Sequence, residues 1–590
     1  MNEPTSISGT DRSLVGVWTG QVHHDGQSDP YVISFAADGT IALRTPGTVG
    51  TGTWTPEQGG RFSYDLTETF TPASGRAGQL RAHVEAHLEG TTHRGIGVAR
   101  IYTPDGTLVH STTAEFTGDR TAEATAPWHS TVGLGTSIRG RTSYPGDDDF
   151  DDACSGWLLT VDHRPAAVVI AADAGDVATA VRFAAQTRRP VAVQSTGHGV
   201  SVPADDAVLI STRELRELSV DPGANTARIG AGLRWEEVIG ATAEHGLAPL
   251  SGSSGQVGVM GYLTGGGLPL TCRTYGFAAS HVRSLELVTA DGQVRTVSPE
   301  RDPDLFWAAR GAKSNFGVVT SAEIELVPLR DIYAGELLYP VEDSERASHL
   351  LRSYLGWVKE QPDEMSTSIT LLRLPDVPQL PEEFRGRSLI QIHVVHTGDE
   401  AQGRTLVEPL RALGPKSDSC AMMPYSRITE LHHDPKHPVM IHYRSALLDE
   451  LDETAVATLA SFIDPAAPPE LLPGIELRHL GGALDRPPRR PHPVSTQDAA
   501  FHLWMRMPIS PEQADEVRTA ADQVLDRLKN WDTGFQLPGF LFDHDSGPEQ
   551  VARAYAEPDR RRLAELKAEY DPANLFRVNH NILPNLPQGR

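Results

Sequence analysis

The first part of the chain alternates apolar and polar positions over short runs, and turn signals separate these runs. A period of two places the apolar side chains on one face of a strand. Asp38-Gly39 and Asp105-Gly106 lie between such runs and favour tight hairpins. Because eight runs follow one another without a helical pattern, residues 1–119 are predicted to form an all-β barrel that closes on itself. The runs begin at residues 14, 31, 40, 51, 61, 80, 94 and 108.

Helical and strand-like patterns alternate after residue 140. Residues 120–139 have no period and contain Thr, Ala, Pro and Gly, so a linker is predicted there. Residues 282–297 contain two strand patterns about Asp291-Gly292, which predicts a hairpin. The other elements predicted in this part are a helix over 175–187 that opens at Asp176 and strands over 165–170, 190–193 and 207–212.

Amphipathic helices alternate with strand-like runs between residues 332 and 531. This order favours an antiparallel sheet with helices on one face. Residues 548–572 have a helical pattern and lead into the C-terminus. The elements predicted before them are helices over 344–360, 399–413, 452–463 and 511–531, and strands over 366–374, 388–396, 475–484 and 499–507.

Composition narrows the class of partner. The chain has 52 Lys and Arg against 77 Asp and Glu, and a net charge of −25 disfavours binding to nucleic acid and to anionic membranes. No apolar run approaches the ~18 residues of a membrane span, so a cytoplasmic location is expected. Cys154, Cys272 and Cys420 are too far apart for a disulfide framework or a metal-ligand spacing. We therefore expect a small-molecule partner and no metal.

Residues 249–273 are rich in glycine. Such residues let the backbone turn with positive φ, and their bare N–H groups form an anion-binding concavity. A flexible linker is the alternative, but Val257, Met260 and Tyr262 interleave apolar side chains that a solvated linker lacks. The stretch is predicted to hold an anionic ligand. Its glycines are Gly252, Gly255, Gly258, Gly261, Gly265, Gly266 and Gly267.

A second glycine-bearing loop, residues 194–199, follows a predicted buried strand. It contains His198, and a histidine on such a loop can lie against a ring system and act as a nucleophile. A structural histidine is the alternative interpretation. The residues by themselves leave both open.

The order of these motifs resembles a known family. The segments HRPAAVVIAADAGDVATAVRFAAQTRRPVAVQSTGHG, AGLRWEEVIGATAEHGLAPLSGSSGQVGVMGYLTGGG and DLFWAARGAKSNFGVV resemble the PCMH-type FAD-binding domain of the vanillyl-alcohol-oxidase superfamily. The segment YDPANLFRVNHNILP resembles the terminal motif of its berberine-bridge-enzyme branch. The resemblance implies an α+β FAD-binding domain over 140–331, an antiparallel-sheet substrate domain over 332–535 and a segment over 536–590 that returns to the FAD domain.

The N-terminal barrel is an addition that this family does not usually carry. The segments GVWTG, FAADGT and GTGTW resemble a lipocalin-type barrel. Two interpretations stay open for it, a ligand-binding cup and a structural or oligomerising module.

The resemblance implies FAD as the cofactor, with a covalent bond from His198 to the 8α position of the flavin. Many relatives make a second bond from a cysteine, but Ser254 has that place here, and a hydroxyl is not expected to replace a thiolate. Single attachment through His198 is therefore expected. The chain departs from the usual family residues at Gln194, Thr196, Pro269 and His580.

The glycine stretch is expected to hold the FAD pyrophosphate through backbone N–H groups. The resemblance implies that residues 317–319 and two C-terminal asparagines also contact FAD. The residues expected to bind FAD are Gln194, Ser195, Thr196, Gly197, His198, Gly199, Gly252, Ser253, Ser254, Val257, Gly258, Gly261, Tyr262, Gly265, Gly266, Gly267, Gly317, Val318, Val319, Asn579 and Asn581.

No motif marks the catalytic base. Hydride removal needs a group that takes the O–H or N–H proton of the substrate. Bacterial relatives often place two tyrosines where this chain has Gly539-Phe540-Leu541-Phe542. The catalytic candidates are Tyr425, Tyr443, His502 and Trp504, with Arg506 on the same strand face as the last two, and with Asp543 and His544 as further alternatives.

Three functions are compatible with these residues. The first is an FAD-dependent oxidase or dehydrogenase that removes a hydride from an alcohol, a sugar or a natural-product scaffold, with O2 as the final acceptor. The second is an oxidative cyclase or desaturase of secondary metabolism on the same scaffold. The third is a flavin-binding protein whose redox role is lost.

Overall fold

The computed structural model describes residues 15–35, 39–45, 48–57, 59–70, 78–103, 106–120, 134, 138–374, 376–378, 382–466, 474–542 and 545–585. The chain divides into two compact units, Met1–Ala153 with Arg164–Val169 and Cys154–His163 with Ile170–Arg590. Most of the predicted linker, 120–139, lies outside the described residues, as do Asp38 and Asp105 of the two predicted hairpins. The predicted domain boundaries stay predictions.

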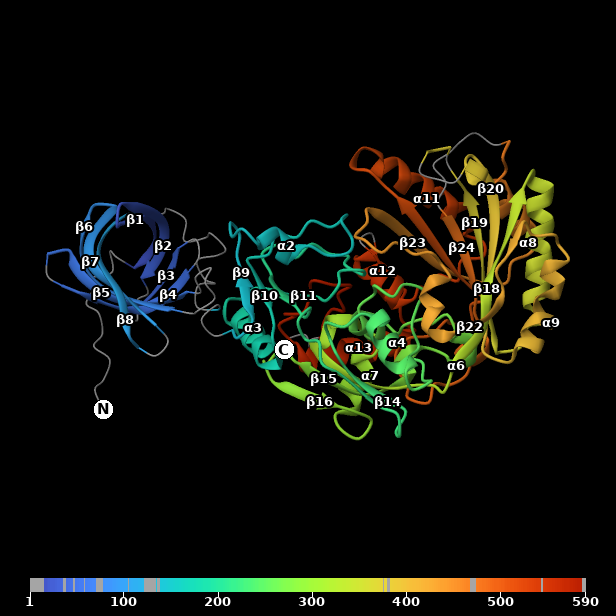
Figure 1. Cartoon of the computed structure of the whole chain (residues 1–590), viewed down its shortest axis with the longest axis horizontal. Coiled ribbons are helices and arrows are strands. Elements are labelled where there is room, and N and C mark those ends of the chain that lie inside the picture. Colours follow the sequence, from blue (N-terminus) through green and yellow to red (C-terminus); the bar gives the residue numbers. More distant parts are fainter. Residues whose placement is uncertain are drawn as a thin grey trace. The chain divides into compact units, whose positions relative to one another are not determined.

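Eight antiparallel strands close into a barrel in the first unit, which confirms the predicted all-β barrel (Figure 1, blue). Strand β1 pairs with β2 on one side and with β8 on the other, so the sheet has no free edge. The strands are β1 (Gly16–His24), β2 (Gln27–Phe35), β3 (Thr40–Thr45), β4 (Thr48–Pro56), β5 (Arg61–Phe70), β6 (Gly78–Glu89), β7 (Thr92–Tyr102) and β8 (Leu108–Arg120).

Alternate strand positions build the barrel interior. On β2, Tyr31, Ile33 and Phe35 are buried, and the residues between them are more exposed. The Phe35 ring packs edge to face against Trp54 and Phe62, with ring centroids 5.8 Å and 5.4 Å away. The first unit therefore has an apolar core of its own. Its role, ligand-binding or structural, stays a prediction.

The second unit contains a five-stranded sheet of order β13-β14-β17-β15-β16, and β11 pairs with β12 in parallel. The hairpin predicted about Asp291-Gly292 is present as the antiparallel pair β15 and β16. The elements of the chain from residue 141 to residue 325 are β9 (Arg141–Ser143), α2 (Phe150–Cys154), β10 (Ala167–Ile170), α3 (Ala174–Gln186), β11 (Val191–Gln194), β12 (Val208–Ser211), β13 (Leu218–Asp221), β14 (Thr226–Gly230), α4 (Trp235–Ala243), α5 (Val259–Thr264), α6 (Cys272–Tyr275), η3 (Ala278–His281), β15 (Val282–Val288), β16 (Val294–Val297), α7 (Pro303–Ala309), η4 (Lys313–Phe316) and β17 (Val318–Glu325).

Helix α3, which precedes β11, begins earlier than predicted. Asp173, and not Asp176, is its N-cap, and the Asp173 carboxylate accepts from the Asp176 N–H at 3.0 Å. The Asp176 carboxylate in turn accepts from the Ala172 N–H at 2.9 Å. These two bonds pair the Asp176 N–H of the first turn and the N–H of Ala172, which lies just before the cap.

A large sheet of order β21-β18-β20-β19-β24-β25-β23 follows, with β22 also paired to β18. Its neighbouring strands are antiparallel, as predicted. Strands β18 and β23 were not predicted, and residues 548–572 form two helices instead of one. The elements are β18 (Asp331–Val341), α8 (Ser344–Val358), β19 (Met365–Arg373), η5 (Glu382–Phe384), β20 (Ser388–His396), α9 (Glu400–Arg411), β21 (Ser417–Asp418), β22 (Ala421–Pro424), η6 (Tyr425–Glu430), β23 (Ile441–Leu448), α10 (Glu453–Phe462), β24 (Gly474–His479), η7 (Gly482–Asp485), β25 (Phe501–Pro508), η8 (Pro511–Gln513), α11 (Ala514–Leu528), η9 (Pro538–Phe540), α12 (Pro548–Ala552) and α13 (Glu557–Tyr570).

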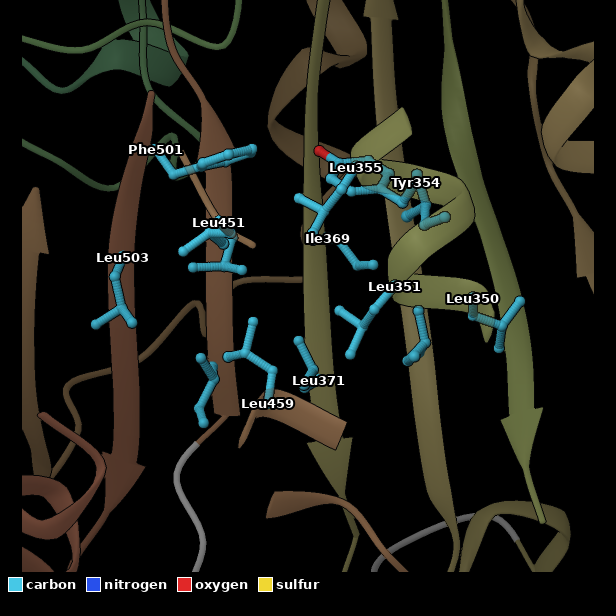
Figure 2. Close-up of a cluster of buried hydrophobic side chains, with 14 of the residues drawn as sticks. Leu350, Leu351, Tyr354, Leu355, Ile369, Leu371, Leu451, Leu459, Phe501 and Leu503 are labelled. Carbon is cyan, nitrogen blue, oxygen red and sulfur yellow. The ribbon is translucent and has the colours of Figure 1, made fainter. Parts of the chain in front are cut away.

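One face of the large sheet is apolar and packs against helices α8 to α11. Figure 2 shows Leu351 of α8 beside Ile369 and Leu371 of β19, with Leu503 of β25 in the same cluster. Because successive side chains of a strand alternate between faces, the opposite face receives the residues between these apolar positions. This polar face carries Tyr443, Arg478, Trp504 and Arg506.

No helix in the described part of the chain is both long and apolar enough to cross a membrane. Within the same residues, no group of three or more His, Cys, Asp or Glu side chains could hold a metal ion. Cys154, Cys272 and Cys420, which all lie in the described part of the chain, form no disulfide there.

Candidate functional site

A cavity of about 340 Å³ lies in the second unit, and both glycine-bearing loops and the polar face of the large sheet contribute to its wall. Residues predicted to bind the cofactor and residues predicted to be catalytic therefore share one cavity. The predicted residues on its wall are Gln194, Ser195, Thr196, Gly197, His198, Gly199, Gly252, Ser253, Ser254, Val257, Gly258, Gly261, Tyr262, Gly265, Gly267, Gly317, Val319, Tyr443, Trp504 and Asn579.

The loop of residues 194–199 packs backbone to backbone on the segment that carries Trp157. The Trp157 N–H donates to the carbonyl oxygen of Thr196 at 2.8 Å. Gly197 has a φ of +76°, and a Cβ at this position would lie 2.7 Å from the Cα of Gly156. Only glycine allows this approach, which brings Trp157 onto the loop.

The His198 side chain has a partner at its ring face and at Nδ1, but none among the described residues at Nε2. Its ring stacks on Trp157, with centroids 4.2 Å apart and 16° between the planes. Its Nδ1 lies 2.9 Å from Thr196 Oγ1, which also accepts from the Gly258 N–H at 3.2 Å. Its Nε2 is buried and has no hydrogen-bond partner among the described residues. Burial, with a smaller contribution from the charge of Arg234, lowers the pKa of His198 to about 3, so the imidazole is neutral at physiological pH.

Gly197→Ala is expected to lower the free energy of unfolding of the second unit by about 1–3 kcal/mol, because alanine avoids this backbone conformation and its methyl group would meet Gly156. Urea unfolding measures the loss. Gly199→Ala is the matched control, since no atom lies within 4 Å of a Cβ there, and a change within about 0.5 kcal/mol is expected. Equal losses in the two variants would refute this account of the loop.

The glycine stretch forms α5 and the turn that follows it. Gly261 lines the cavity, and a Cβ there would meet no atom within 4 Å. At Gly267, where φ is +67°, a Cβ would lie 2.4 Å from Cε1 of Tyr262. Glycine therefore leaves room for a ligand at one position and lets the backbone approach Tyr262 at the other.

Five buried polar atoms on the cavity wall have no hydrogen-bond partner among the described residues, namely Oε1 of Gln194, Nε2 of His198, Oη of Tyr262, Nε1 of Trp504 and Oδ1 of Asn579. Buried polar groups in folded proteins are almost always paired, so this set indicates that a ligand supplies the partners. The set contains donors and acceptors, and a glycine backbone lies beside it. These residues fit the FAD that the sequence implies.

Three residues predicted to bind the cofactor do not line this cavity. A Cβ at Gly266 would meet the Val494 side chain. Val318 is fully buried and pairs with Val288 across the five-stranded sheet. Asn581 lines a separate cavity of about 320 Å³ that α12 and α13 also border. Binding of FAD by Asn581 stays a prediction, because Asn581 does not line the cavity that contains His198.

Tyr443, Trp504, Phe540 and Phe542 form the aromatic wall of the cavity. Phe542 stacks on Tyr443 with centroids 4.6 Å apart, and Trp504 meets Phe540 edge to face at 4.3 Å. Phe540 and Phe542 belong to the segment where relatives often have tyrosines, so neither offers a phenol. Burial raises the pKa of Tyr443 to about 12, and its phenol keeps its proton at neutral pH.

Two arginines on the cavity wall are paired with carboxylates. Arg478 Nε lies 2.9 Å from Glu476 Oε1, and Arg506 Nη1 lies 2.8 Å from Asp434 Oδ1. Burial by itself would raise the pKa of Glu476, but the Arg478 guanidinium and its neighbours hold that pKa well below its usual range. This part of the wall therefore carries little net charge.

Tyr425 and His502 do not line the cavity. The Tyr425 hydroxyl donates to the carbonyl oxygen of Pro249, at the start of the glycine stretch. The His502 ring is fully buried and packs on Phe540, with centroids 4.2 Å apart, and burial lowers its pKa to about 3. His502 therefore supports a residue of the wall, whereas Tyr425 holds the start of the glycine stretch. Two further catalytic candidates, Asp543 and His544, lie outside the described residues.

Sequence reasoning missed Trp157, Lys313 and the side chain of His580 as parts of the cavity wall. Trp157 belongs to no motif, and no signal in the sequence connects it to His198. His580 did carry a signal, because it interrupts a motif that otherwise follows the family pattern. The structure brings the Lys313 and His580 side chains together although 267 positions separate them.

Two family models match the chain, an FAD binding domain over residues 165–298 and a berberine and berberine-like model over residues 542–583. The (R)-6-hydroxynicotine oxidase of Paenarthrobacter nicotinovorans is 31% identical over 460 residues, which cover 76% of this chain and 97% of that protein. An FAD-linked oxidoreductase of Dictyostelium discoideum is 25% identical over 458 residues, which cover 76% of this chain and 95% of that protein.

Solved structures share the fold. The crystal structure of 6-hydroxy-D-nicotine oxidase from Arthrobacter nicotinovorans has a TM-score of 0.66 at 27% identity and covers 76% of this chain and 98% of its own. A chitooligosaccharide oxidase has a TM-score of 0.67 at 18% identity and covers 78% of this chain and 100% of its own. The latter likeness shows the fold alone.

Proposed function

Because the chain belongs to the berberine-bridge-enzyme-like FAD-linked oxidoreductases, we propose that it removes a hydride from a ring-bearing organic substrate and passes it to FAD joined to His198. The cofactor and the class of enzyme follow from the family. We propose, in addition, which residue is attached to FAD, which class of substrate is oxidised and which molecule finally accepts the electrons.

The environment of His198 is the observation that carries the proposal. Thr196 Oγ1 has two lone pairs, so it can accept from both the Gly258 N–H and the Nδ1–H of His198. This tautomer leaves the lone pair of Nε2 free for bond formation on the cavity wall. Ser254 lines the same cavity with a hydroxyl instead of a thiol, which supports attachment through His198 alone.

The aromatic wall supports a flat, ring-bearing substrate. FAD supplies the hydride acceptor when it is bound. The four aromatic side chains exclude water and can stack on a ring of the substrate. Because Arg478 and Arg506 are already paired with carboxylates, an uncharged substrate matches the wall better than an anion. The protonated Tyr443 would donate a hydrogen bond to the substrate and would not remove its proton.

Among the substrates expected from the sequence, this wall suits an aromatic alcohol or a natural-product scaffold better than a free sugar. The name of the 31% identical relative, a 6-hydroxynicotine oxidase, also describes a ring-bearing substrate. We expect O2 to reoxidise the cofactor, and we keep the cytoplasm as the expected location.

The aromatic wall also favours a second candidate, the oxidative cyclase or desaturase. Loss of a hydride leaves a positive charge on the substrate, and the faces of aromatic rings stabilise cations. An internal group of the substrate would then trap this charge. Structures of the products distinguish this reaction from simple oxidation.

Anaerobic mixing with a library of ring-bearing alcohols and amines tests the proposal. The purified protein is expected to be yellow, a substrate is expected to bleach it, and air is expected to restore the colour. Trp504→Ala should keep the colour but bleach about three- to tenfold more slowly, because a stacking contact contributes about 0.5–1.5 kcal/mol. Bleaching without recovery in air would indicate a dehydrogenase, and colourless protein would rule the proposal out.

A further inference from the structure

Lys313 is a charged side chain on the cavity wall that the proposed function does not use. It is half-buried and begins the short 3₁₀ helix η4, directly before β17. Its φ is +51°, in the left-handed region that residues other than glycine rarely adopt. Such conformations are concentrated at functional sites, so a lysine kept here points to a use for its side chain.

A hydrogen-bonded chain orients the Lys313 side chain. Lys313 Nζ donates to Nδ1 of His580 at 3.3 Å, and Nε2 of His580 lies 3.0 Å from the carbonyl oxygen of Phe542. A carbonyl oxygen only accepts, so Nε2 carries the proton of a neutral imidazole and Nδ1 presents its lone pair to the ammonium. The ammonium has three N–H donors, and this bond uses one of them.

Within the described part of the chain, no carboxylate lies within ion-pair distance of the Lys313 ammonium. Burial lowers its pKa to about 8, and the negative charge of Asp545 partly opposes this effect. Most of the ammonium is therefore charged at neutral pH. Arg478 and Arg506 lie on the same wall but, unlike Lys313, each forms an ion pair with a carboxylate.

Contacts link Lys313 to the part of the cavity where His198 lies. Phe542, whose carbonyl oxygen contacts His580, packs with Trp157 in one apolar cluster. Trp157 in turn stacks on His198. Because the proposed bond from His198 would fix the flavin ring beside it, the ring is the part of FAD closest to this chain of contacts.

We propose that the Lys313 ammonium contacts the flavin ring of FAD and favours its reduced form. The inference rests on the proposed function, since it takes the ring to lie beside His198. In the reaction the C–H bond of the substrate breaks and its electron pair passes with the hydrogen to FAD as a hydride. The substrate is oxidised by two electrons and FAD is reduced by two, with one unit of negative charge added. A cation held beside that charge stabilises it.

Two neutral variants test this role on the holoprotein. Lys313→Gly suits the positive φ and should fold at least as well as the natural chain, and Lys313→Met keeps most of the side-chain length. Both are expected to reduce the equilibrium constant for FAD reduction at least tenfold, which lowers a two-electron midpoint potential by about 30 mV. Lys313→Arg keeps the charge and should stay within about threefold of the natural protein.

Lys359→Met is the matched control, because it removes an exposed lysine that pairs with Glu450. Its midpoint potential should equal that of the natural protein. Redox titration against reference dyes gives the potential, and the absorbance of acid-precipitated protein gives the content of attached FAD.

An unchanged potential in both neutral variants at full FAD content would overturn the inference. Loss of FAD with an unchanged potential in the remaining holoprotein would also overturn it, and would place Lys313 at the diphosphate instead. If the natural protein itself keeps no FAD after acid precipitation, the proposed function fails first and this inference fails with it. The potential and the FAD content therefore separate the two failures.

Discussion

His198→Ala is expected to yield a protein from which acid releases all of its FAD, whereas the natural protein keeps its FAD through acid precipitation. The loss should be complete because alanine has no nitrogen that could form the bond. The hydroxyl of Ser254, on the same cavity wall, is not expected to compensate. Absorbance of the washed and redissolved precipitate and the mass of the intact chain both measure attachment.

His163→Ala is the matched control for this experiment, because His163 lines the same cavity but binds the Ala204 N–H through its Nδ1. This variant should keep its FAD through acid precipitation. Retention by His198→Ala would place the bond on another residue. Loss by His163→Ala would show that any change in the wall releases the cofactor.

Variants of Thr196 test how His198 is prepared for attachment to FAD. Thr196→Val removes the acceptor of His198 Nδ1 and of the Gly258 N–H, so the reactive tautomer loses its support. Attachment of added FAD to the apoprotein should slow about three- to tenfold, since a neutral hydrogen bond contributes about 1 kcal/mol. Thr196→Ser keeps the hydroxyl and should attach FAD at nearly the natural rate.

Lys567→Met is expected to lower the free energy of unfolding of the second unit by about 3–5 kcal/mol, the usual effect of removing one partner from a buried ion pair. Lys567 and Asp571 are both fully buried, with Nζ and Oδ2 2.8 Å apart. Nζ also donates to the carbonyl oxygens of Asn315 at 2.7 Å and of Phe576 at 3.0 Å. The variant leaves a buried carboxylate and two carbonyl groups without this donor.

Urea unfolding followed by circular dichroism measures the effect. Lys359→Met, at an exposed lysine, should change the free energy of unfolding by no more than about 0.5 kcal/mol. Adding Asp571→Asn to Lys567→Met should recover part of the loss, because it removes the unpaired buried charge. If the two single lysine variants unfold alike, the buried pair is not a main support of the C-terminal segment.

The pattern of apolar positions predicted most of the elements correctly. The barrel strands and helices α8 to α11 have clear periods of two and 3.6 residues, which local sequence sets directly. Strand β18 was missed because it is buried on both faces and therefore shows little alternation. The start of α3 was misplaced because two aspartates share the first turn, and only the hydrogen bonds show which of them is the cap.

The two asparagines of the C-terminal motif show the limit of transferring contacts by resemblance. Asn579 lines the FAD cavity, and Asn581, two positions later, lines another. The Asn579 amide donates to Ser314 Oγ at 3.1 Å, a contact that depends on how two distant segments pack. Spacing within the motif carries no information about that packing.

By itself the sequence determined the periods of the strands and helices, the dense glycines that free the backbone for a ligand, and the motifs that indicate FAD. Tertiary structure alone decided that Trp157 stacks on His198, that Phe542 turns its carbonyl oxygen toward His580, and that Lys313 meets His580. Local patterns depend on neighbouring residues, whereas these contacts join segments far apart in the chain. Their partners are fixed by the packing of the whole second unit, because buried polar atoms and rings must find partners wherever the fold places them.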